Sequence, residues 1–152
     1  MKKIVLPAAM FVCLFAAGCN EADTTLEDHI CQAFYDTVAQ PGKQKAVTLS
    51  DAAVALDKEH LTYGFSLSSQ AGNLWTGNVS IVPSRVGEIV IASSNREADF
   101  SLSINGTVVE PVINSNCDVG LYTWPVASAD ETLSVSLKSS KSQVLLMYSV
   151  KD

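Results

Sequence analysis

Hydrophobic and polar residues follow two different periods along this chain. Between residues 26 and 38, apolar residues recur at the three- and four-residue spacing of one helix face. Thr25, followed three residues later by Asp28, resembles a capping box with Asp in place of the usual Glu. Pro41 and Gly42 then interrupt the pattern. It predicts one short N-terminal helix, Leu26–Val38.

From residue 44 onward, apolar and polar residues alternate with the period of two that is typical of half-buried strands. The run Ile89-Val90-Ile91 has no polar partner positions and predicts a strand covered on both faces. Asn105-Gly106 lies between two strand patterns and predicts a tight hairpin, because both turn residues need positive φ. The predicted strands cover residues 47–49, 61–68, 79–81, 88–92, 100–104, 107–109, 121–126, 133–137 and 144–150. This succession of short strands predicts an all-β fold, an antiparallel β-sandwich with one short helix.

The segment before the helix has the layout of a bacterial secretion signal. Lys2 and Lys3 precede the uncharged residues 4–17, and small residues stand directly before Cys19. The apolar run is shorter than the roughly 20 residues that span a bilayer, and Pro7 interrupts it. We therefore expect residues 1–18 to be a cleaved signal peptide rather than a transmembrane helix.

Ala17-Gly18-Cys19 resembles the lipobox of bacterial lipoproteins, although Ala16 stands where that family usually carries Leu. The resemblance implies that the Cys19 thiol receives lipid, such as palmitate, and anchors the protein to a membrane. Residues 19–25 would then be a tether, and residues 26–152 a β-sandwich domain. Asn20, by resemblance to lipoprotein sorting patterns, favours the outer membrane, with the domain in the periplasm. The alternative is an ordinary signal peptide cut at the same place.

The four cysteines support acylation independently. Cys13 leaves with the signal, and a lipid on Cys19 leaves two cysteines, Cys31 and Cys117, to form a disulfide in an oxidising compartment. Without the lipid, one of three thiols stays unpaired. A metal site built on both thiolates is the other reading, but the chain has no Cys-x-x-Cys pair.

Charge narrows the range of partners. With 10 basic and 16 acidic residues, the net charge is −6, and loss of Lys2 and Lys3 makes it more negative. A negative chain does not fit nucleic-acid binding, which needs a basic face. The expected partners are the lipid bilayer through Cys19 and an envelope protein or glycan.

From about residue 60 to 150 the chain resembles the pre-peptidase C-terminal and related jelly-roll accessory domains of secreted bacterial proteins. The resemblance lies in the segments 63–67, 82–90, 99–106 and 120–126, which follow one another in the same rhythm of strands and turns. It implies a jelly-roll-like sandwich with a binding or stabilising role. These domains share no catalytic set, so no functional residue is carried over.

Little in the sequence points to catalysis. There are two histidines, and no Gly-x-Ser-x-Gly motif. A metal site built from His29, His60 and Glu59 is one alternative, against solvent-facing histidines. Trp75, in a predicted loop rich in small residues, could stack on a ligand or pack into the core. Trp124 is expected in the core.

The sequence therefore predicts a non-enzymatic binding or envelope-accessory module without a cofactor. The alternatives are a periplasmic metal-binding protein and an inhibitor of a foreign hydrolase.

Overall fold

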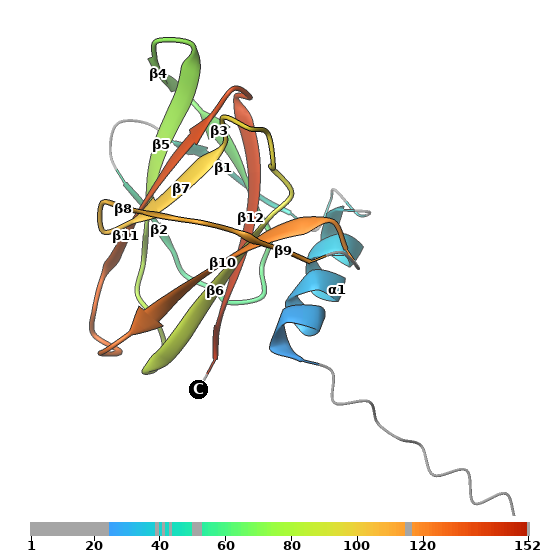
Figure 1. Cartoon of the computed structure of the whole chain (residues 1–152), viewed down its shortest axis with the longest axis vertical. Coiled ribbons are helices and arrows are strands. Elements are labelled where there is room, and N and C mark those ends of the chain that lie inside the picture. Colours follow the sequence, from blue (N-terminus) through green and yellow to red (C-terminus); the bar gives the residue numbers. More distant parts are fainter. Residues whose placement is uncertain are drawn as a thin grey trace, which may run out of the picture.

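The chain folds into two β-sheets that pack face to face, with one helix on the outside (Figure 1). A computed structural model describes residues 25–38, 40, 42, 44–49, 53–114 and 117–151. In these residues there are one helix and twelve strands. The predicted all-β sandwich with a short N-terminal helix is confirmed.

The helix α1 spans Leu26–Val38, as predicted. Sheet A has the strand order β1 (Lys45–Leu49), β3 (Tyr63–Leu67), β12 (Gln143–Lys151), β6 (Gly87–Ser93), β10 (Val119–Val126) and β9 (Val112–Asn114). Sheet B has the order β2 (Val54–Leu56), β5 (Leu74–Ile81), β11 (Leu133–Ser139), β7 (Ser101–Ile104) and β8 (Thr107–Val109), and β4 (Ser69–Ala71) also pairs with β5.

The strand order is that of a jelly roll. Four antiparallel pairs are nested in the sequence, so that each pair lies between the two strands of the pair before it. From the outermost to the innermost they are β3–β12, β5–β11, β6–β10 and β7–β8. Sheet A contains β3, β12, β6 and β10 side by side, and sheet B contains β5, β11, β7 and β8. This nested pairing, with each sheet taking alternate pairs, is the double Greek key of that architecture.

Most strand pairs are antiparallel, as predicted, and each sheet also contains one parallel pair. β1 pairs with β3 in parallel, and β2 pairs with β5 in parallel, so both sheets are mixed. A parallel pair needs a crossover connection. Between β1 and β3, both in sheet A, the chain forms β2 in sheet B. Between β2 and β5, both in sheet B, it forms β3 in sheet A. Alternation of apolar residues places a side chain on a face but does not give the direction of the strand.

Strand β6 is covered on both faces, as its apolar run predicts. Ile89 and Ile91 belong to the core between the sheets, whereas Val90 and Ala92 pack under α1. The helix contributes Ile30 and Phe34 to this second cluster, and both are almost fully buried. Helix α1 therefore forms a third layer over the outer face of sheet A (Figure 1).

Hydrogen bonds at its N-terminal end and a disulfide in its middle fix this helix. The Thr25 hydroxyl accepts a hydrogen bond from the Asp28 amide at 3.2 Å and donates one to the Asp28 carboxylate at 2.9 Å, which confirms the predicted cap. Cys31 forms a disulfide with Cys117, in the turn before β10, with 5.7 Å between the two Cα atoms. The predicted disulfide is therefore present, and it joins α1 to the edge of sheet A.

The remaining local predictions have different outcomes. Asn105 and Gly106 both have positive φ, 50° and 82°, so the β7–β8 hairpin has the predicted turn. Trp75, however, lies in β5 rather than in a loop, because the strand begins at Leu74. β5 is longer than the short strand that its C-terminal alternation predicts.

Candidate functional site

The three predicted metal ligands are not brought together. His29 is exposed on α1, whereas His60 and Glu59 lie in the turn before β3. In the described part of the chain, no three His, Cys, Asp or Glu side chains are grouped so that they could hold a metal ion. The set of His29, His60 and Glu59 does not form a metal centre here.

Glu59 is instead the centre of a hydrogen-bonded group that we call the end cluster: Glu59, His60, Ser84, Arg85 and Ser149. Its carboxylate accepts hydrogen bonds from the Val150 amide at 3.0 Å, from the Ser149 hydroxyl at 3.4 Å and from the Ser84 hydroxyl. The Arg85 guanidinium lies 3.6 Å from the same carboxylate and donates to the Val150 carbonyl. The end cluster thus ties the turn before β3 to the β5–β6 loop and to β12.

These contacts set the ionisation of Glu59. Burial alone would raise its pKa. The hydrogen bonds from Ser84 and the Val150 amide, together with the nearby positive charge of Arg85, outweigh burial, so the pKa of Glu59 lies below its usual value. The carboxylate is held in its charged form.

The end cluster contains a Ser–His contact, and this raises the question of nucleophilic catalysis. The Ser149 hydroxyl lies 3.0 Å from His60 Nε2, within reach for proton transfer. Ser149 is fully buried in β12, however, and Glu59 contacts the hydroxyl itself. A substrate has no access to this oxygen, so the arrangement serves to hold the end of the sandwich together.

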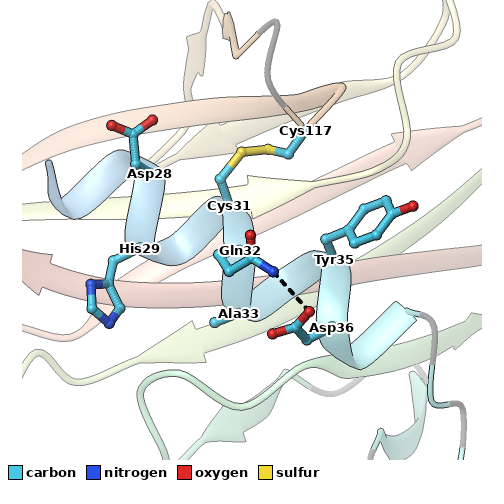
Figure 2. A pocket seen from close by; sticks show the side chains of 8 residues that line it. All are labelled: Asp28, His29, Cys31, Gln32, Ala33, Tyr35, Asp36 and Cys117. Carbon is cyan, nitrogen blue, oxygen red and sulfur yellow. Dashed lines mark hydrogen bonds between the residues drawn. A yellow bond between two sulfur atoms is a disulfide. The ribbon is translucent and has the colours of Figure 1, made fainter. Parts of the chain in front are cut away.

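A cavity of about 640 Å³ lies against the outward side of α1 (Figure 2). Its described lining comes from α1 and from Cys117 alone. Figure 2 shows Asp28 and His29 leaving the helix in opposite directions, and the only hydrogen bond drawn joins Gln32 to Asp36, at 2.8 Å. The described residues therefore form one wall of this space, and their side chains do not converge on a common point.

A second cavity, of about 460 Å³, has walls from several elements and is the better candidate for binding. We call it the sheet A groove. Its floor is the outer face of β1, β3 and β12, where Ala46, Gly64 and Leu145 stand in one paired row. The polar residues around this floor are Gln44, Ser66, Ser94, Asn95, Lys141 and Gln143. Phe65 and Val144 belong to the core on the opposite face.

The row across the floor of the groove consists largely of small residues, which is why it is hollow. A Cβ built on Gly64 would lie 3.4 Å from Leu145 Cδ2 and 3.5 Å from Gln44 Oε1, in ordinary contact distance. The backbone there can accept a side chain, so a larger residue would fill the groove without displacing the core.

Hydrogen bonds hold the rim of the groove in place. Asn95 is buried, with 6% of the residue exposed. Its Oδ1 accepts from the Leu145 amide at 3.3 Å, and its Nδ2 donates to the Gln143 carbonyl at 3.4 Å. Lys141 pairs with Glu97. Burial alone would raise the pKa of Glu97, but the hydrogen bond and positive charge of Lys141, together with hydrogen bonds from the backbone and from Asn95, outweigh burial and lower it. The rim therefore carries a compensated ion pair, and the remaining polar side chains are uncharged amides and hydroxyls.

The predicted ligand-binding residue Trp75 lies elsewhere. It is half-buried, packs against the core between the sheets, and pairs with Gln70 of β4 and Ser139 of β11. Trp124 also packs against this core, as predicted. Neither indole lines the groove.

Cys19 and the expected signal peptide lie outside the described residues. Within the described ranges, no helix has both the length and the apolar character needed to cross a membrane. No protein-family model matches the chain, and no curated protein matches it at a significant level. The resemblances to lipoproteins and to pre-peptidase C-terminal domains therefore rest on the residues that carry them.

The groove was not predicted from the sequence. Ala46, Gly64 and Leu145 look like unrelated positions in the sequence, and only the register of β1, β3 and β12 places them beside one another. Small outward residues in consecutive strands are the signal that could have indicated a hollow face.

Proposed function

We propose that this protein is an outer-membrane lipoprotein whose periplasmic domain is a non-enzymatic binding module, with the sheet A groove as its binding surface. The observation that carries the proposal is the groove itself, a cavity rimmed by amide and hydroxyl side chains and one internally compensated ion pair. Such a surface offers hydrogen bonds without net charge, which matches the hydroxyl groups of a glycan.

Disulfide pairing supports the lipid anchor. Cys31 and Cys117 are bonded to each other, so Cys19 has neither of them as a partner. Cys13 would leave with the signal peptide. Acylation would block the Cys19 thiol. Without it, Cys19 would be an unpaired, reactive cysteine in an oxidising compartment.

The intact mass of the mature protein, purified in detergent from its native membrane without reductant, tests the anchor. We expect a chain that starts at Cys19, heavier by a diacylglyceryl and an acyl group and lighter by two hydrogens for the disulfide. An unmodified chain with a titratable thiol at Cys19 would contradict the anchor.

The groove is tested by adding soluble cell-wall glycan fragments to the ¹⁵N-labelled domain and following amide shifts by NMR. We expect the shifts to centre on Ser66, Ser94 and Gln143. Gly64→Val should abolish them, because its side chain fills the floor. Ser80→Val, at a half-buried position on the outer face of sheet B, is the matched control and should bind like wild type.

Equal binding by both variants would place the ligand elsewhere and contradict the groove. A different outcome is that no glycan causes amide shifts, while wild type and Ser80→Val capture an envelope protein that Gly64→Val does not capture. That outcome would show that the groove binds a protein instead.

A further inference from the structure

Two large apolar side chains are exposed together at one end of the sandwich. Val82 and Val86, in the loop between β5 and β6, are 54% and 57% exposed. Between them, Arg85 is held by Glu59 and by the Val150 carbonyl of the end cluster. The loop is therefore fixed to the body of the domain while its valines face outward.

The same end is where the chain enters the domain. Glu27, in the first turn of α1, pairs with Lys151 at 3.2 Å, and Lys151 stands opposite Glu88 at the start of β6. Figure 1 shows the start of α1 and the C-terminal end close together at this end, with the β4–β5 hairpin at the opposite one. The exposed valines and the start of the helix thus belong to one end of the molecule.

Tether length restricts how an anchored domain can stand on a membrane. From Cys19 to Thr25 a fully extended chain spans at most about 20 Å. Strand β5 alone, with eight residues, is about 26 Å long. The tether therefore cannot reach a bilayer that lies beyond the far, β4–β5 end, but it easily reaches one beside the β5–β6 loop.

We propose that the β5–β6 loop faces the bilayer in which Cys19 is anchored, and that Val82 and Val86 contact its surface. This inference rests on the proposed lipid anchor. The neighbouring β10–β11 loop adds Asp130 and Glu131, since Val126 pairs with Gly87 and Leu133 with Ile81. These carboxylates and Glu88 disfavour an anionic surface, so the lipid that fits this end is zwitterionic phospholipid.

The test uses the full acylated protein with one added cysteine, because its Cys19 is blocked by lipid and its other two cysteines are bonded. Val86→Cys and Val82→Cys place an environment-sensitive dye on the proposed contact. Asn73→Cys, in the exposed β4–β5 turn, is the matched control at the far end. Each labelled protein is mixed with phosphatidylcholine vesicles, with and without a lipid-borne quencher.

We expect the dye at residues 82 and 86 to shift its emission to the blue on vesicles and to lose intensity with the quencher, while the dye at residue 73 does neither. Flotation with the vesicles is measured on the same samples. Protein that floats but is quenched equally at both ends overturns the orientation alone. Acylated protein that fails to float overturns the anchor, and the orientation with it.

Discussion

Gly77 is a residue whose missing side chain shapes the core. It is buried in β5, and a Cβ there would lie 2.6 Å from Leu49 Cδ1 and 2.7 Å from Leu67 Cδ2. Leu49 is fully buried and Leu67 almost so. Because protein cores contain few voids, a displaced methyl group of either leucine would have to push against other core side chains.

Gly77→Ala should therefore lower the free energy of unfolding by about 1–3 kcal/mol, as overpacking does in other cores. Gly64→Ala is the matched control. It should change stability little or raise it slightly, since its Cβ meets nothing closer than 3.4 Å. Urea unfolding of both variants measures the difference, and equal stability of the two would contradict the close packing at Gly77.

At the scale of elements, the strength of the sequence signal decides which parts could be predicted. Helix α1 and strand β6 were predicted because their patterns are long and almost uninterrupted. Strands β2, β4 and β9 have three residues each, too few for a period of two to stand out. The alternation of apolar and polar residues is the same for parallel and antiparallel strands, so it could not show that β1 and β2 pair in parallel. For the same reason, the groove, which depends on register between strands, could not be predicted.

Helix α1 depends on its disulfide as well as on its apolar face. The Cys31–Cys117 bond closes a loop of 86 residues, so breaking it enlarges the entropy of the unfolded chain. The double variant Cys31→Ser, Cys117→Ser should lose about 2–4 kcal/mol of unfolding free energy. Amide exchange should speed up most in α1, with β5 and β11 still protected.

The wild-type protein under strong reductant also lacks the disulfide and serves as the comparison. It should show the same loss of stability and the same faster amide exchange in α1 as the double variant. Unchanged exchange in α1 after both treatments would mean that Ile30, Phe34 and the cap hold the helix without the disulfide.

At the scale of the whole molecule, the end cluster joins segments that are far apart in sequence. Glu59 connects to the β5–β6 loop through Ser84 and Arg85 and to β12 through Ser149 and Val150. Because folding lowers the pKa of this carboxyl, its contribution to stability is complete above the ordinary value of 4.5 and is lost as the pH falls through the folded-state pKa.

Glu59→Gln should thus destabilise the domain by about 1–2 kcal/mol at pH 7 and by progressively less in acid. Thermal unfolding of wild type and variant between neutral and acidic pH measures this. Gly64→Ala, which changes no ionisable group, is the control, and its difference from wild type should stay constant over this pH range. A Glu59→Gln deficit that stays constant with pH would argue against a charged Glu59 in the cluster.

The position of β12 between β3 and β6 has a consequence for the order of events as the chain is synthesised. Sheet A cannot become continuous until residues 143–151 have been synthesised, because they supply the strand that both neighbours need. Pairing over such long sequence separations is slow. A chain with this topology therefore gains its final form only after its last strand has been made.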